Sequence, residues 1–258
     1  MSMRAPRPLR KGIVIALDPP VLDLGRHAAI DVPRALADAY DTHQVGDRLL
    51  VRFATAMGAE QKRDLIEGGG FVGIDAPSID TPRGAEHLRI ERARTLPDRV
   101  GPQLRVLLCG LNPSLYAADV GVGFARPGNR FWPAALASGL LTVDRDPRHA
   151  LDAHGIGMTD LVKRATARAD ELSRNEYVTG AARVARLCHL LEPRVLCVVG
   201  LTGWRIGVDK LAATGPQPES IGRTLVYVMP NPSGLNAHVT VGDLAEHFRI
   251  VGALAGQA

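Results

Sequence analysis

Three short apolar runs in the C-terminal part of the sequence restrict its fold most strongly. They are LRVLLC, RVLCVVG and TLVYVMP, at residues 104–109, 194–200 and 224–230. Such runs are too short for typical buried helices, and each ends at or beside glycine, proline or asparagine, as expected for buried parallel strands. Helical patterns lie between them, for example FWPAALASGL at residues 131–140. This alternation predicts an α/β fold with three layers, in which helices cover both faces of a central, mostly parallel sheet.

The same part of the chain should contain further helices and one more strand. We expect a short strand or turn at residues 155–162, and helices at residues 201–208 and 241–255. Residues 173–191 have a largely helical pattern, but Gly180 lies inside it. Because glycine weakens a helix interior, we expect a break there.

Residues 1–100 have a different pattern. Strand, helix and strand patterns follow one another at residues 46–55, 59–69 and 71–77. Residues 80–100 combine proline and charge without an apolar face, which predicts an exposed connection. We therefore expect a smaller N-terminal α/β extension with its linker at residues 1–100 and the main domain at residues 101–258. The extension resembles the distal half of a Rossmann-like methyltransferase sheet but lacks a G-x-G-x-x-G loop, so we interpret it as an accessory or degenerate unit.

Length and composition bound the class of protein. With 258 residues, of which 46% are hydrophobic and 22% charged, the chain is ordinary for a soluble α/β protein and has room for one good core and a second, smaller unit. No apolar run approaches the roughly 20 residues of a membrane helix. The basic start leads into the short run IVIAL and then Asp18-Pro19-Pro20, which does not fit a signal peptide. We expect a cytoplasmic monomer without membrane contact.

The cysteines and the net charge are weak indicators of function. Cys109, Cys188 and Cys197 lie in apolar stretches without C-x-x-C spacing, so we expect core thiols and neither a disulfide framework nor a metal or iron–sulfur site. The formal charge of +4 and the pI near 9.2 are compatible with a nucleic-acid partner without requiring one.

Two of the predicted strands end in related loops. The strand ending at Cys109 leads into GLNPS at residues 110–114, and the strand ending at Pro230 leads into NPSGLNAH at residues 231–238. In open α/β sheets, ligand sites lie at the carboxyl ends of the strands. Leu235 stands between glycine and asparagine, where a leucine either anchors the loop in the core or packs on a partner such as the base stack of DNA.

Together with a third segment, these loops resemble a known family. GLNP at residues 110–113, FARPGNRFW at residues 124–132 and NPSGL at residues 231–235 are similar to motifs of the mismatch-specific uracil/thymine-DNA glycosylase family, within the uracil-DNA glycosylase superfamily. The motifs occur in this order, and the resemblance covers the chain from about Leu104 to the C-terminus. Residues 1–100 are not covered.

The resemblance implies an enzyme, a monofunctional DNA glycosylase that hydrolyses the N-glycosidic bond of uracil in DNA. In this family the target also includes thymine or modified pyrimidines opposite guanine. The base leaves the stack for a pocket, and an abasic site remains for base excision repair. By motif matching, Asn112 orients the attacking water, Phe124 stacks on the flipped pyrimidine and Asn231 faces the departing base.

The resemblance also implies DNA contacts and a substrate range. Ser233 would contact a phosphate, while Leu235, supported by Gly234, would fill the space that the base vacates. Ser114 stands where stricter uracil enzymes have a bulky tyrosine, and Ala117 also keeps the loop small. We therefore expect tolerance of 5-substituted pyrimidines, an expectation that extends to thymine.

Asp160 lies in the segment GMTDL, which the resemblance places beside the pocket. A carboxylate there could activate water or stabilise positive charge on the sugar, which an amide cannot do. Alternatively, Asp160 is the N-cap of a helical turn beginning at Leu161. Asn129 and Arg130 either contact the substrate or shape their loop through hydrogen bonds to the backbone.

The resemblance implies no metal or organic cofactor. The motif loops contain no lysine that could form a Schiff base with the sugar, so we expect no strand cleavage. The expected partner is double-stranded DNA that carries uracil or a mismatched or modified pyrimidine, and the protein would be associated with the nucleoid when bound. The alternative is a protein that binds lesions or mismatches in DNA without catalysis.

Overall fold

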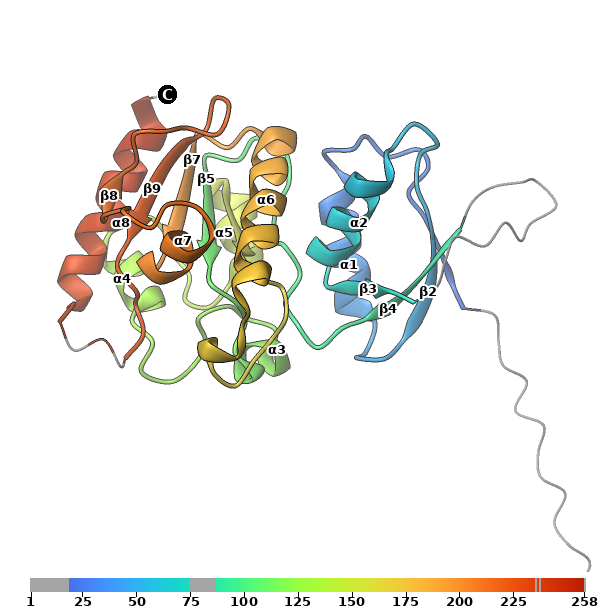
Figure 1. The fold of residues 1–258 in the computed structure, drawn as a ribbon, viewed down its shortest axis with the longest axis horizontal. Coiled ribbons are helices and arrows are strands. Elements are labelled where there is room, and N and C mark those ends of the chain that lie inside the picture. Colours follow the sequence, from blue (N-terminus) through green and yellow to red (C-terminus); the bar gives the residue numbers. More distant parts are fainter. Residues whose placement is uncertain (1–18, 75–86, 235, 237, 258) are drawn as a thin grey trace, which may run out of the picture.

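The computed structural model describes residues 19–74, 87–234, 236 and 238–257, which form two α/β units side by side (Figure 1). We call the described residues up to 95 the N-terminal unit and those from 96 onward the C-terminal unit. None of the helices in these residues combines the length and apolar content needed to cross a lipid bilayer.

Five strands form the sheet of the C-terminal unit. They are β5 (Val106–Gly110), β6 (Ile156–Asp160), β7 (Val195–Val199), β8 (Gly215–Pro216) and β9 (Leu225–Met229). Their order is β6-β5-β7-β9-β8, and only the edge strand β8 is antiparallel to its neighbour. Every residue of β5, β6 and β7 is buried, which is typical of parallel strands covered on both faces.

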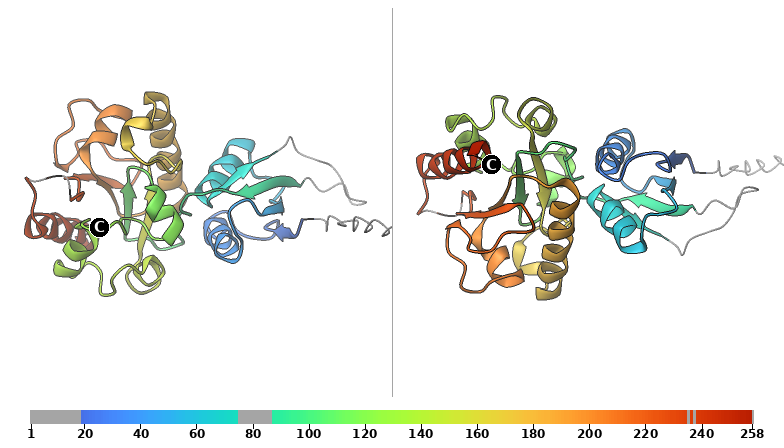
Figure 2. Two further views of the ribbon diagram at one scale, coloured as in Figure 1. Left: turned by 90° about the horizontal axis from the view of Figure 1, so that it is seen from below. Right: turned by 90° about the horizontal axis from the view of Figure 1, so that it is seen from above.

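Helices cover both faces of this sheet (Figure 2). On one face lie α4 (Phe131–Ala137) and α8 (Val241–Gln257), and on the other lie α6 (Arg174–Leu191) and α7 (Leu201–Gly207). Alternate residues of β5 enter the two cores, because Leu108 belongs to the core that contains Phe248 and Leu107 to the core that contains Val184. The predicted three-layer fold with a mostly parallel sheet is confirmed.

Two shorter helices complete the C-terminal unit. They are α3 (Leu115–Val120), which follows β5, and α5 (Pro147–His154), which precedes β6. The three cysteines are buried free thiols in β5, α6 and β7. Burial raises the pKa of Cys188 to about 12 and also raises the pKa of the other two thiols. They are core thiols, as predicted.

Helix α6 is continuous, so the break expected near Gly180 is wrong. Its 18 residues begin after the N-cap Ser173, whose hydroxyl accepts a hydrogen bond from the Glu176 N–H in a capping box. A Cβ at position 180 would lie 2.0 Å from the Leu161 carbonyl oxygen. Glycine is therefore required here by the close approach of the chain that follows β6, and the packing outweighs its low helix propensity.

The N-terminal unit has a mixed four-stranded sheet. Its strands are β1 (Val21–Asp23), β2 (Arg48–Arg52), β3 (Phe71–Gly73) and β4 (Leu88–Arg92), in the order β1-β2-β4-β3. Helices α1 (Val32–Thr42) and α2 (Ala59–Gly68) lie between this sheet and the C-terminal unit (Figure 1). Its core joins Leu36 and Tyr40 of α1 to Val51 and Ile90 of the sheet. The predicted N-terminal α/β extension is confirmed.

The exposed connection expected at residues 80–100 is wrong for its described part. Strand β4 pairs with both β2 and β3 and buries Ile90 completely. Leu96, Asp98 and Val100 are also buried. The charged residues of β4 alternate with apolar ones, as expected for a strand with one face on a core, and this alternation is easily missed in so short a segment. Residues 75–86, which include the end of the strand expected at residues 71–77, lie outside the described part of the chain.

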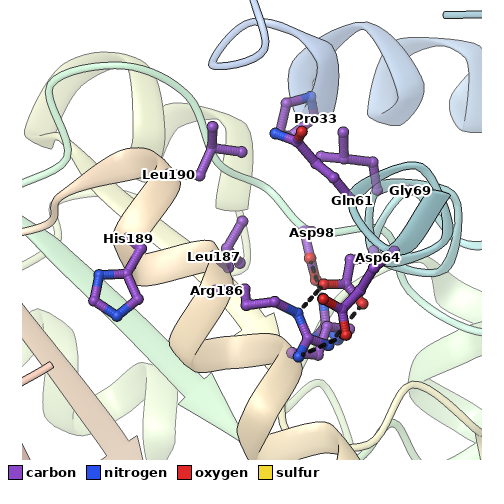
Figure 3. A pocket seen from close by; sticks show the side chains of 13 residues that line it. Pro33, Gln61, Asp64, Gly69, Asp98, Arg186, Leu187, His189 and Leu190 are labelled. Atoms are coloured by element: carbon purple, nitrogen blue, oxygen red, sulfur yellow. Dashed lines mark hydrogen bonds and ion pairs between the residues drawn. The ribbon is translucent and has the colours of Figure 1, made fainter. Parts of the chain in front are cut away.

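Ion pairs join the two units. Arg186 of α6 donates from Nε to Oδ2 of Asp64 in α2 at 2.5 Å, and Figure 3 shows this pair in the wall of a cavity of about 350 Å³ between the two helices. Asp41 of α1 forms an ion pair with Arg99 at 2.6 Å and another with Arg148 of α5. These contacts hold the N-terminal unit against the C-terminal unit.

Candidate active site

A cavity of about 170 Å³ lies at the carboxyl edge of the C-terminal sheet. The segments that follow β5, β7 and β9 form its walls, together with the loop between α3 and α4. Its polar and aromatic lining includes Asn112, Phe124, Asn129, Thr202 and Asn231. Three residues predicted from the sequence motifs, Asn112, Phe124 and Asn231, thus meet in one cavity, although Asn231 is far from the other two in the chain.

A larger cavity lies between the two units, but its charged groups are engaged with one another. In the cavity of Figure 3, Arg186 is paired with Asp64, and Arg183 with Asp98. The smaller cavity is the better candidate site because its amide groups keep hydrogen-bonding capacity for a ligand.

The amide of Asn112 is held in one orientation. Its Nδ2 donates to the Thr166 hydroxyl at 2.8 Å, the Arg164 carbonyl at 3.0 Å and the Pro113 carbonyl at 3.2 Å. The two carbonyls can only accept hydrogen bonds, so they exclude the flipped amide. No donor within the described residues reaches Oδ1. Asn112 therefore offers a fixed hydrogen-bond acceptor, which can orient a water molecule through one of its protons.

Phe124 provides an aromatic wall. Its ring stacks on Phe131, with the centroids 4.0 Å apart and an angle of 10° between the planes. Phe131 is completely buried, so the stack rests on the core. Phe124 also has a φ of 58°, which is uncommon for a residue with a side chain. The surrounding loop holds it there, and a planar pyrimidine could stack on the ring as the sequence analysis expects.

The side-chain amide of Asn231 is oriented in the opposite way to that of Asn112, with its oxygen engaged and its nitrogen available. Its Oδ1 accepts a hydrogen bond from the Ser233 N–H at 2.9 Å, forming an Asx turn. Its Nδ2 finds no acceptor among the described residues. Asn231 therefore offers a donor, which suits a carbonyl oxygen on a base.

Arg130 fastens the loop that carries Asn231. Its Nη2 donates to the carbonyls of Ser233 and Asn236 at 2.5 and 2.6 Å, and its Nη1 donates to the Val239 carbonyl. Its backbone N–H adds a bond to the Pro232 carbonyl at 3.0 Å. Of the two alternatives left open for Arg130, the structure supports the shaping of a loop, and that loop follows β9.

Asn129 also shapes its own loop. Its Oδ1 accepts the Phe131 N–H at 2.9 Å, close to the start of α4. Its side chain also lines the cavity.

Asp160 lies beside the cavity and not in it. It is the last residue of β6 and pairs with Gly110, the last residue of β5. Its carboxylate lines a separate cavity of about 20 Å³, enough for one water molecule, and Phe124 lines both cavities. A Cβ at position 110 would lie 2.5 Å from Oδ1 of Asp160 and 3.1 Å from Phe124. The glycine of GLNP therefore makes room for both side chains.

The environment of Asp160 favours its neutral form. Burial raises the pKa of its carboxyl group to about 6, although Lys163 and Arg183 act against this effect. The alternative that Asp160 caps a helix is wrong, because no helix begins at Leu161 and the next α-helix starts at Arg174. A carboxylate with a pKa near neutrality is well suited to accept a proton from water.

Ser114 and Ala117 lie at the start of α3, which follows β5. The Ser114 hydroxyl accepts a hydrogen bond from the Ala117 N–H at 3.1 Å and caps α3. Ala117 is buried within the same helix. Neither residue is part of the cavity lining, so their predicted influence on the substrate range depends on what larger side chains would do at these positions.

The segment predicted to contact DNA is described in part. Ser233 is half-buried, and a Cβ at Gly234 would lie 2.7 Å from the Gly128 carbonyl oxygen. Gly234 therefore lets the two motif loops touch. Leu235, which we expect to fill the space left by a flipped base, lies outside the described residues.

The sequence analysis missed the part of the cavity lining that follows β7, which includes Gly200 and Thr202. Gly200 has a φ of 116° and precedes α7, and a Cβ there would lie 3.7 Å from the Cβ of Asn231. Thr202 is in the first turn of α7. The available signal was the glycine that ends RVLCVVG, since it marks the exit of a third parallel strand at the same sheet edge.

Residues 97–250, more than half of the chain, match the family described as the uracil DNA glycosylase superfamily. Among solved structures, the chain is similar to the solution NMR structure of a proposed uracil DNA glycosylase from Methanosarcina acetivorans. That likeness has a TM-score of 0.45 and 19% sequence identity, and it covers 62% of this chain and 97% of the other.

Proposed function

The chain belongs to the uracil DNA glycosylase superfamily, and we propose that it is a monofunctional, mismatch-specific DNA glycosylase that releases uracil from DNA. Its preferred substrate is double-stranded DNA in which the base lies opposite guanine. The product is an abasic site, the starting point of base excision repair.

The arrangement of three groups in one cavity carries this proposal. Asn112 presents an acceptor, Asn231 presents a donor, and Phe124 presents a ring face. A flipped pyrimidine stacks on Phe124 with a carbonyl oxygen toward Asn231, while Asn112 Oδ1 orients a water toward the anomeric carbon. The water attacks as the glycosidic bond breaks, and the base leaves with the bonding electron pair. Donors aimed at the departing base stabilise this charge.

The proton lost by the attacking water needs an acceptor. An amide is a poor base, so Asn112 orients the water and does not deprotonate it. Asp160 is the best candidate for the base, because its buried carboxylate has a pKa of about 6 and lies at the end of the neighbouring strand. Phe124 lines both the cavity of Asp160 and that of Asn112. Asp160 therefore accepts the proton after Phe124 shifts on substrate binding, or through a chain of water molecules.

The glycosylase should release the base without cutting the strand. Lys163 is the lysine nearest to Asp160 in the sequence, and its Nζ is buried against Asp98 at 2.8 Å. Among the described residues that line the cavity there is no lysine. A Schiff base with the sugar requires an accessible, neutral amine, which supports simple hydrolysis.

Single-turnover release of uracil from a labelled duplex with one U·G pair tests the proposal. We expect release by the parent protein and a loss of about 100-fold or more in Asn112→Ala, because the oriented acceptor is removed. Asn175→Ala is the matched control, since Asn175 is an exposed asparagine on α6, and it should retain the parental rate.

The substrate range follows from the same assay with other duplexes. U·A, T·G and 5-substituted uracil opposite guanine measure opposite-base preference and tolerance of 5-substituents, and we expect the T·G duplex to be processed more slowly than U·G. If the parent binds the U·G duplex tightly but releases no base from any of these duplexes, the protein is a lesion-binding protein and the glycosylase proposal fails.

A further inference from the structure

A buried cluster of three charged side chains lies next to the end of β6. Asp98 accepts hydrogen bonds from Lys163 Nζ at 2.8 Å and from Arg183 Nη1 at 2.7 Å. The residues are 2%, 3% and 3% exposed, respectively. Buried charges are expensive unless they are paired. Burial acts to raise the pKa of Asp98, but Arg183 and Lys163 outweigh it and keep the pKa below its ordinary value.

The cluster holds the end of β6 in place. Arg183 Nη2 donates to the Asp160 carbonyl at 2.7 Å and to the Thr159 hydroxyl at 3.0 Å. The Thr159 hydroxyl in turn donates to Asp98 at 2.6 Å. Asp98 is thereby connected through two residues to the backbone that carries the Asp160 carboxylate.

The N-terminal unit closes the cluster from the other side. The Asp98 N–H donates to the carbonyl of Gly68, the last residue of α2, at 2.6 Å. A Cβ at Gly68 would lie 2.5 Å from Oδ2 of Asp98, so the end of this helix packs directly on the carboxylate. Figure 3 shows Asp98 in the wall of the cavity between α2 and α6.

The charges of the cluster do not cancel. Lys163 and Arg183 carry two positive charges and Asp98 carries one negative charge, which leaves one positive charge beside Asp160. Ionised Asp160 balances it. The other groups that face Asp160 contribute little, because burial keeps the Cys109 thiol neutral and Arg99 of the small cavity is paired with Asp41.

We propose that Asp98, acting through Lys163 and Arg183, is a positioning residue that holds the end of β6 and sets how readily the Asp160 carboxylate ionises. The N-terminal unit thereby acquires a role, since the end of its helix α2 packs on Asp98 and covers one side of this charge cluster. The catalytic consequence rests on the proposed function, whereas the ionisation of Asp160 does not.

Two substitutions change the charge beside Asp160 in opposite directions. Asp98→Asn gives the cluster a net charge of two positive units, and Lys163→Met gives it a net charge of zero. The pKa of Asp160 should therefore fall in Asp98→Asn and rise in Lys163→Met, each by about one pH unit, the smaller end of the effect of a nearby charge. A merely structural role would not produce shifts of opposite sign.

The pKa is measured directly by a ¹³C carboxyl NMR titration of protein labelled at aspartate, with the Asp160 signal assigned from Asp160→Asn. Asp64→Asn is the matched control, because Asp64 is paired with Arg186 in the same seam and should leave the titration of Asp160 unchanged. Equal Asp160 titration in the parent, Asp98→Asn and Lys163→Met would overturn the proposal. Lys163→Met keeps the Asp98–Arg183 pair, so it provides the test if Asp98→Asn fails to fold.

The pH profile of single-turnover base release gives the second readout. The acidic limb of the profile should move to lower pH in Asp98→Asn and to higher pH in Lys163→Met. In Asp98→Asn, which loosens the end of β6, the rate at the plateau should also be about 10-fold lower. If the titrations shift as expected but no protein releases a base, the proposed function fails and the tuning of Asp160 stands. If base release occurs with an unshifted limb and unshifted titrations, the tuning fails and the glycosylase stands.

Discussion

The loops at residues 112–114 and 231–233 have the same sequence, Asn-Pro-Ser, and follow parallel strands of the same sheet. They present opposite ends of their amides to one cavity. In the first loop the nitrogen of Asn112 is consumed by three acceptors and the oxygen remains available. In the second loop the oxygen of Asn231 is consumed by the Ser233 N–H and the nitrogen remains available.

The difference arises from the neighbours of each loop. The first lies beside the chain that follows β6, whose Arg164 carbonyl and Thr166 hydroxyl face it. Among the described residues, no other segment offers an acceptor to the Asn231 side chain, and the second loop turns back on itself, fastened from outside by Arg130. An identical tripeptide thus supplies an acceptor for water in one place and a donor for a base in the other. The same asparagine-to-aspartate change should therefore have different consequences in the two loops.

Asn112→Asp should have the largest effect. The substitution keeps an oxygen acceptor but replaces the donor with a second oxygen, which faces the Thr166 hydroxyl and two carbonyls. Repulsion from the carbonyls turns the side chain, and we expect a loss of about 100-fold in single-turnover base release. A rate within threefold of the parent would show that the three donor contacts do not matter for orientation.

Asp160→Asn extends the comparison to the strand beside β5, which ends in a carboxylate. The pKa of Asp160 lies at about 6 instead of 3.8, so ionisation costs the folded state about 3 kcal/mol at 1.4 kcal/mol per pKa unit. Because this pKa is raised, the cost is absent below pH 3.8 and complete above pH 6. We expect Asp160→Asn to be more stable than the parent by about 3 kcal/mol at pH 7.5 and by less at pH 4.5.

Urea denaturation at the two pH values measures this difference. Single-turnover rates of the same variant should fall, since the proposed base is lost. Parallel stability curves for the parent and the variant would contradict the buried, tuned carboxylate.

Asn231→Asp should have a smaller effect than Asn112→Asp. Its oxygen can still accept the Ser233 N–H, so the turn is retained, but the free donor disappears. We expect about a 10-fold loss in base release, the value of roughly one hydrogen bond to a charged group. Asn231→Ala loses both the turn and the donor and should be no better. An Asn231→Asp rate equal to that of the parent would remove Asn231 from base recognition.

Ser114→Ala should have the smallest effect. The hydroxyl of Ser114 caps α3, and its removal should lower the free energy of unfolding by about 1 kcal/mol. Urea denaturation measures the change. Unchanged stability would mean that the first Asn-Pro-Ser loop does not depend on its cap.

Much of the fold follows from the sequence because it depends on local patterns. The runs that became β5, β7 and β9 were recognisable as buried strands, and the motifs identified Asn112, Phe124 and Asn231. The pattern failed where local preference and packing disagree. Gly180 predicted a break, but the helix needs glycine for its contact with Leu161. The strand β4 was not recognised in the sequence because it contains several charged residues. Its partners β2 and β3 come from separate segments of the chain.

The sequence by itself determined the layered sheet, the edge at which the site lies and the residue types that meet there. The reason is that buried strands and the loops that follow them can be recognised from patterns of neighbouring residues. Only the tertiary structure decided which end of each amide faces the cavity, and that Asp98, Lys163 and Arg183 meet beside Asp160. Hydrogen bonds and ion pairs between distant segments have no period along the chain. They exist only once two units and three strand ends have been packed together.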